Sequence, residues 1–195
     1  MVQSDAETTG YPLLNKSCYS TQCKTPDKPL ADNYQSGEER KMNDCEYMRY
    51  ALAEARKAAD AGEVPVGAVM VKENKIIASS RNLRETEHDA TAHAELLCIK
   101  EACAALGSWR LSDCTLYVSL EPCPMCAGAI INARIKRVVF GAYDSRAGSF
   151  GSLINLAFYP YNHRPEICGG VLAQESEELM RLFFRNLRKE TESPK

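Results

Sequence analysis

Hydrophobic and polar residues follow a regular pattern from about residue 42 onward, and they follow no sustained pattern before it. The first 41 residues contain many Thr, Ser, Asn, Lys and Pro residues, so we interpret residues 1–41 as a disordered or weakly ordered tail. Met42 stands where the pattern begins, and we hypothesise that translation of the functional protein starts there. We therefore assign residues 42–195 to one domain.

Helix-like and strand-like segments alternate within this domain. After Asp44, which can cap a helix, apolar residues recur every three or four positions up to Gly62 and predict a first helix. The segments 64–71 and 75–80 have the apolar and β-branched character of strands, and the short turn between them predicts a hairpin. Three further strands are predicted at 115–119, 137–142 and 167–172.

Three more helices are predicted along the chain. Thr91 can cap a helix that runs to about Leu106. Cys123 is suited to be the N-cap of the next helix, because Pro124 then takes the favoured first helical position. A closing helix at 175–189 has four predicted core positions: Leu179, Leu182, Phe183 and Leu187. This alternation predicts an α/β fold, a three-layer α-β-α sandwich with a central mixed five-stranded sheet.

Composition and charge narrow the classes of function. A chain of 195 residues with 45% hydrophobic residues can bury one ordinary core. The net charge of −2 provides no overall basic field, although a local basic face is compatible with it. Apolar runs are too short to span a bilayer and no secretory pattern opens the chain, so we expect a cytoplasmic protein without membrane association. The nine cysteines fit a reducing compartment, because two of them form a metal-binding pattern.

His93, Glu95, Cys123 and Cys126 form the chemically distinctive group. One imidazole and two thiolates suit a zinc ion and leave its fourth coordination position open, as catalytic zinc sites do. Cys123 and Cys126 are three positions apart, so both sulfur atoms can reach one ion, and a helix N-terminus favours their thiolate form. Zinc makes bound water acidic, and Glu95 is placed to move protons in a hydrolytic reaction.

Simpler interpretations exist for each of these signals. The cysteine pair alone is also typical of half a zinc ribbon or of a redox pair. His88 and His163 are not needed as ligands, and Glu121 can support the site or simply end a strand. Cys18 and Cys23 could form half of a second metal site, but free thiols fit better because no further ligand is near them. The combination of the pair with the histidine and the glutamate favours catalytic zinc.

The pattern H-x-E followed by P-C-x-x-C is that of zinc-dependent nucleobase deaminases. From about Asp44 to Lys189 the chain resembles the bacterial tRNA-specific adenosine deaminases of the cytidine-deaminase-like superfamily. The matching segments are 63–69, 91–95, 120–129, 137–142, 151–153, 162–164 and 183–185. The zinc pattern is typical of the whole superfamily, whereas the segments 162–164 and 183–185 are more specific to the tRNA branch.

This resemblance implies a cytidine-deaminase-like fold with one zinc ion per subunit, a homodimer, and a tRNA anticodon stem-loop as the partner. It implies hydrolytic deamination of the wobble adenosine to inosine, in which zinc-bound hydroxide attacks C6 and Glu95 shuttles protons. Four substrate contacts carry over by position. Asn82 would bind the flipped adenine, Asp144 the sugar of the neighbouring nucleotide, and Arg185 and Arg188 the RNA backbone.

Two positions depart from the family pattern. Ala90 stands where the family usually has Pro, and Tyr143 replaces a residue that is often basic. Both concern substrate contacts more than the reaction.

A deaminase of a free nucleobase or nucleoside, such as cytosine, cytidine or guanine, would share the zinc chemistry without needing the basic residues of the last helix. A non-catalytic, zinc-stabilised RNA-binding subunit is a second alternative, but it would have no use for Glu95.

Overall fold

The structure is a computed structural model that describes residues 42–192. Its helices and strands follow one another along the chain as α1 (Asp44–Asp60), β1 (Gly67–Lys72), β2 (Lys75–Arg81), α2 (Arg84–Glu87), α3 (Ala94–Leu106), β3 (Cys114–Leu120), α4 (Pro124–Asn132), β4 (Arg137–Ala142), the 3-10 helix η2 (Leu156–Phe158), β5 (Glu166–Cys168) and α5 (Ala173–Glu192). The predicted tail and the cysteines within it lie outside the described residues. Among residues 42–192, the structure has no helix long and apolar enough to cross a membrane.

The five strands form one mixed sheet in the order β2-β1-β3-β4-β5. The strand β1 is antiparallel to β2 and β3, whereas β3, β4 and β5 are mutually parallel along the sheet. The prediction of a mixed five-stranded sheet is therefore confirmed, and the hairpin at its start is present. Because β3 and β4 are parallel, their carboxyl ends meet at one edge, and the segments that follow them meet there too.

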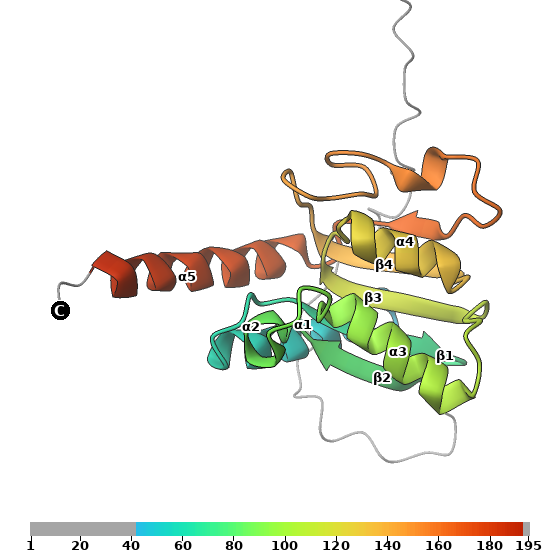
Figure 1. The fold of residues 1–195 in the computed structure, drawn as a ribbon, viewed down its shortest axis with the longest axis horizontal. Coiled ribbons are helices and arrows are strands. Elements are labelled where there is room, and N and C mark those ends of the chain that lie inside the picture. The colour runs from blue at the N-terminus through green and yellow to red at the C-terminus, as the bar shows by residue number, and fades with distance from the viewer. Residues whose placement is uncertain (1–41, 193–195) are drawn as a thin grey trace, which may run out of the picture.

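Side chains that alternate along the strands feed two separate cores. On one face, Val118 and Phe140 pack with the buried side chains of α3 and α4. On the other face, Tyr117 and Val139 pack with the apolar side of α1. In Figure 1, α3 and α4 lie in front of the sheet and α1 lies behind it. These layers confirm the predicted α-β-α sandwich.

The two predicted N-caps Asp44 and Thr91 are wrong. The N-cap of α1 is Asn43, which forms a capping box with Glu46. Asp44 is instead the first helical residue, and its carboxylate accepts hydrogen bonds from an arginine that is distant in the sequence. The N-cap of α3 is His93, because the hydroxyl and the amide of Thr91 both donate to Asp89, each at 2.7 Å, within the preceding turn.

Two strands also differ from the prediction in their bounds, and one short helix was not predicted. The strand β1 begins at Gly67 rather than at residue 64, and β5 is only three residues long. A Cβ on Gly67 would overlap the Ala55 amide nitrogen, so this strand passes directly against the α1 backbone. The short helix α2 was not predicted, because its sequence is polar and its residues are not buried.

The helix α5 extends away from the sandwich, as Figure 1 shows. Its base is fixed where the buried Ser176 hydroxyl donates to the carbonyl of Ser119 in β3. Farther along, Leu182 and Phe183 are only half-buried, and Leu187 is 45% exposed. The prediction that Leu187 is a core position is therefore wrong. A helical period can mark an apolar stripe, but it does not tell whether a sheet lies beneath it.

Candidate metal centre and active site

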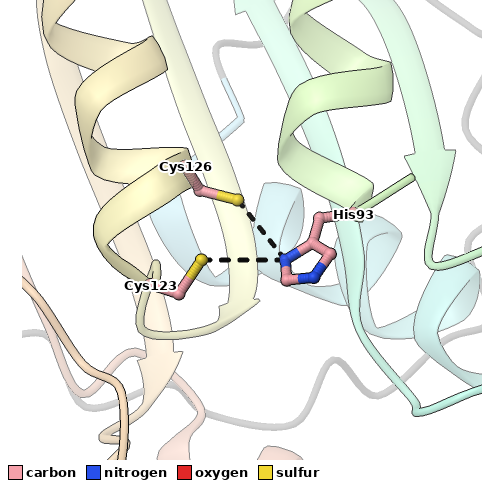
Figure 2. A group of neighbouring side chains, drawn as sticks. All are labelled: His93, Cys123 and Cys126. Atoms are coloured by element: carbon pink, nitrogen blue, oxygen red, sulfur yellow. Dashed lines mark hydrogen bonds between the residues drawn. The ribbon is translucent and has the colours of Figure 1, made fainter. Parts of the chain in front are cut away.

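The starts of α3 and α4 lie side by side and present three metal-ligand side chains to one another. His93 is the N-cap of α3 and Cys123 is the N-cap of α4, and both have extended backbone conformations. Cys126 lies in the first turn of α4 and is fully buried. Figure 2 shows both sulfur atoms directed at the imidazole ring from the neighbouring helix. The two helix N-termini add partial positive charge, which favours thiolates at this place.

The distances between the donor atoms fit a tetrahedral zinc ion. His93 Nδ1 lies 3.7 Å from Cys123 Sγ and 3.6 Å from Cys126 Sγ. All three donor atoms lie within 4.8 Å of one another. With ordinary zinc–sulfur and zinc–nitrogen bond lengths, a tetrahedral angle separates the two kinds of donor by about 3.6 Å. The donor set and its spacing therefore match a zinc site with three protein ligands and one open position.

The pKa values of the two thiols also indicate that a cation would bind between them. A hydrogen bond from Cys126 is the main reason that the pKa of Cys123 is lowered, to about 4. The same hydrogen bond and burial raise the pKa of Cys126. The protein alone thus stabilises one thiolate and opposes the second, because two like charges would lie in contact. A divalent cation removes that opposition.

Glu95 is the buried carboxyl group of this site. It lies in the first turn of α3 and is 4% exposed. Burial is the main reason that the pKa of the Glu95 carboxyl is raised, and the sulfur atoms of Cys123 and Cys126 are among its electrostatic neighbours. In a regular helix, residues two apart point in different directions. His93 and Glu95 share one site because His93 precedes the helix, with φ −77° and ψ 147°.

Asn82 follows β2 and enters the same region from another side. The next residue, Leu83, donates its amide to the carbonyl of Ala92, 3.0 Å away, which joins this segment to the chain entering the metal site. The Asn82 side chain is 5% exposed, and its Nδ2 donates to Glu63 Oε2 at 3.0 Å. Because a carboxylate can only accept hydrogen bonds, Glu63 determines which end of the Asn82 amide faces it.

Known proteins share this sequence and this architecture. The sequence model of the MafB19-like deaminase family matches residues 42–188. The tRNA-specific adenosine deaminase of Bacillus subtilis (strain 168) is 54% identical over 144 residues, which are 73% of this chain and 89% of that protein. The chain belongs to the tRNA-specific adenosine deaminase family. Its resemblance to that family, inferred from the sequence, is thereby confirmed.

Solved structures support the same assignment for this deaminase. A structure from work described as "Biochemical and Structural Studies of A-to-I Editing by tRNA:A34 Deaminases at the Wobble Position of Transfer RNA" superimposes with a TM-score of 0.67 at 44% identity, covering 69% of this chain and 98% of that one. The guanine deaminase of Bacillus subtilis is more distant, with a TM-score of 0.51 and 32% identity over 79% of this chain and 99% of that one.

Asp144 lies in the loop that follows β4. Its side chain accepts a hydrogen bond from the Arg146 amide at 2.9 Å, and its own amide donates to Glu121. A cavity of about 240 Å³ separates this loop from α5 in the deaminase, and Tyr143 and Phe184 contribute aromatic side chains to its lining. The unusual residue Tyr143 thus lines this cavity and packs edge-on against Phe140, with 5.1 Å between ring centroids.

Arg185 and Arg188 are exposed on the part of α5 that extends away from the sandwich. The structure does not place them among the metal ligands, so their predicted role in RNA binding concerns a separate surface.

The other two histidines are accounted for without metal. His163 Nε2 lies 2.7 Å from the carbonyl of Ile135, and His88 is an exposed helix C-cap with a left-handed backbone.

Two buried glutamates lie near the site: the sequence indicated no role for Glu63, and for Glu121 it left open whether the residue supports the site or only ends a strand. Glu63 is fully buried and accepts hydrogen bonds from Asn82 and from the amides of Glu85 and Thr86. Burial opposes ionisation of Glu63, but the Thr86 and Glu85 donors outweigh it and lower the pKa. Glu121 is 2% exposed and binds the loop after β4. Each glutamate stands at one end of a strand-like apolar segment, and this position was visible in the sequence. It did not reveal which groups the two carboxylates bind.

Proposed function

We propose that this deaminase converts the wobble adenosine of a tRNA anticodon to inosine. The observation that carries the reaction type is the buried Glu95 beside three donor atoms spaced for zinc. The substrate is inferred from the relatives, one named a tRNA-specific adenosine deaminase and one described as a tRNA:A34 deaminase. Adenosine and water give inosine and ammonia in this reaction.

When bound, zinc would supply an activated water to the reaction. His93, Cys123 and Cys126 would hold the ion. The Glu95 carboxylate would take a proton from the attacking water and deliver it to ring nitrogen N1 of the adenine. It would then pass the second proton to the amino group at C6, which leaves as ammonia. Burial raises the pKa of the Glu95 carboxyl, which is the direction that helps this group to hold a proton and pass it on.

Substrate binding would use the remaining predicted residues. A deaminase must take its base out of the stack, and an anticodon loop makes this inexpensive because its bases are already unpaired. Asn82 would bind the flipped adenine, and Asp144 the sugar of a neighbouring nucleotide. Arg185 and Arg188 would contact the phosphate backbone. The proposal includes a homodimer with one zinc ion per subunit, and a cytoplasmic location.

The test is deamination by zinc-loaded protein of two kinds of substrate side by side. One is an anticodon stem-loop with adenosine at the wobble position, and the other is a panel of free cytidine, cytosine, guanine and adenosine. Inosine in the stem-loop with no turnover of the free compounds would support the proposal. A stem-loop with adenosine moved to the adjacent anticodon position is the matched control and should remain unmodified.

A free-base deaminase is the second candidate, because a guanine deaminase has the same fold at 32% identity. Turnover of free guanine alone would favour that candidate and would discard the RNA contacts proposed for Asp144, Arg185 and Arg188. It would leave the roles of His93 and Glu95 unchanged. No turnover of any substrate by zinc-loaded protein that binds the stem-loop would favour the non-catalytic subunit.

A further inference from the structure

Glu121 lies between β3 and the metal-binding segment, and both oxygen atoms of its carboxylate accept hydrogen bonds from one loop. Oε2 accepts from the amide of Asp144 at 3.1 Å and from the hydroxyl of Ser152. Oε1 accepts from the amide of Phe150 at 2.9 Å and from that of Ser152 at 3.1 Å. A carboxylate has about four acceptor sites, so these donors use its whole capacity.

The loop is wrapped closely around this carboxylate. A Cβ at Gly148 would overlap Glu121 Oε2 and would lie 2.5 Å from the carbonyl oxygen of Asp144. Only glycine therefore fits where the loop crosses the carboxylate. The Ser149 amide donates to the carbonyl of Pro122, 2.9 Å away, which ties the same loop to the residue before Cys123.

Glu121 connects the metal-binding segment to Asp144, the predicted substrate contact. Glu121 is two residues before Cys123, which is held at the start of α4. Through its carboxylate it holds the amide of Asp144, and the Asp144 side chain is steadied by the Arg146 amide at 2.9 Å. Asp144 therefore reaches the site on a loop whose position is set by a group adjoining the metal-binding segment.

We propose that Glu121 is a positioning residue that fixes Asp144 relative to the metal ligand Cys123, so that a nucleotide beside the reacting adenosine is bound in register. This inference rests on the proposed function, because it assigns Asp144 a substrate contact. Glu121 itself does not touch the substrate. A purely structural Glu121 would contribute to stability without any specific link to the contact made by Asp144.

The experiment combines Glu121→Gln with Asp144→Ala in the full-length, zinc-loaded protein. An amide at residue 121 turns one acceptor oxygen into a donor that faces two other donors. Loss of such charge-assisted hydrogen bonds should raise KM for the stem-loop about tenfold, with a smaller change in kcat. In the Asp144→Ala background the same substitution should raise KM no further, because the contact that it positions is already absent.

A substrate-free measurement accompanies the kinetics. Hydrogen exchange of the amides of Asp144, Phe150 and Ser152 should be at least ~10-fold faster in Glu121→Gln, at unchanged zinc content. The gentler Ser152→Ala variant removes one of the four hydrogen bonds and should shift exchange in the same direction if Glu121→Gln does not fold. Unchanged exchange in the folded variants would overturn the proposal.

The matched control is Asp44→Asn. Asp44 is also a carboxylate that accepts hydrogen bonds from several donors, but it lies at the opposite end of β4. The substitution should lower the melting temperature without any coupling to Asp144. Additive effects of Glu121→Gln and Asp144→Ala on KM would show a structural role for Glu121 and overturn the inference. Failure of wild-type protein to deaminate the stem-loop would instead refute the proposed function, and hydrogen exchange would then decide the inference alone.

Discussion

The basic end of α5 offers the sharpest test of RNA binding. Arg185 and Arg188 are exposed and three positions apart, so they lie on one side of the helix about 4.5 Å apart along its axis. Long side chains at that spacing can contact neighbouring phosphates. We expect the double variant Arg185→Gln/Arg188→Gln to bind the stem-loop more weakly and with a smaller dependence on salt, because fewer counterions are released.

The size of the effect follows from the number of contacts. Each phosphate contact contributes about 0.7 to 0.9 to the slope of log affinity against log salt concentration. Two contacts therefore contribute about 1.4 to 1.8 to the slope. Between 50 and 200 mM salt, the affinity advantage of wild type over the double variant should shrink by about seven- to twelvefold.

The assay is fluorescence anisotropy of a labelled stem-loop with protein carrying Glu95→Ala, so that no substrate is consumed. The control is Arg110→Gln, which removes one exposed charge beyond the C-terminal end of α3, whereas His93 lies at the N-terminal end of that helix. Its slope should equal that of wild type. An unchanged slope in the double variant, or an equal change in the control, would refute phosphate contacts by Arg185 and Arg188.

Three further predictions concern single carboxylates. Glu95→Ala should retain zinc and fold but lower kcat by at least ~100-fold, measured as inosine formed per zinc ion; retained turnover would contradict the proton shuttle. Glu63→Gln should raise KM for the stem-loop about tenfold, because its new amide donors would face the Asn82 amide; an unchanged KM would show that Asn82 does not need this orientation. Asp44→Asn should lower the free energy of unfolding at pH 7 by about 1–2 kcal/mol, after allowance for partial exposure. Burial raises the pKa of Asp44, but hydrogen bonds from Arg137, at 2.8 Å, and from Tyr117 outweigh it and lower the pKa below 3.8. A lowered pKa adds stability above pH 3.8 that is lost as the pH falls through the folded-state pKa, so the difference from wild type in urea unfolding should persist at neutral pH and disappear in acid. An equal difference at both ends of the range would contradict this ion pair.

Several boundaries could not be predicted because distant residues compete for local signals. Asp44 has the side chain of a good N-cap, yet Arg137, 93 positions away, holds its carboxylate and Asn43 caps the helix instead. Thr91 likewise bonds to Asp89 in a turn. Local patterns describe what a residue can do, and tertiary contacts decide which of those options is used.

The sequence by itself determined the five strands, the four main helices and their layers, and it predicted the candidate zinc ligands of this deaminase. Periodicity is a local property, and an imidazole with two thiolates three positions apart is a chemical signature that survives without coordinates. Tertiary structure alone decided the partners of Glu63 and Glu121 and the extension of α5 beyond the sheet. Those glutamates bind mainly backbone amides 22 to 31 positions away, and a backbone amide has no residue type by which a sequence could reveal it.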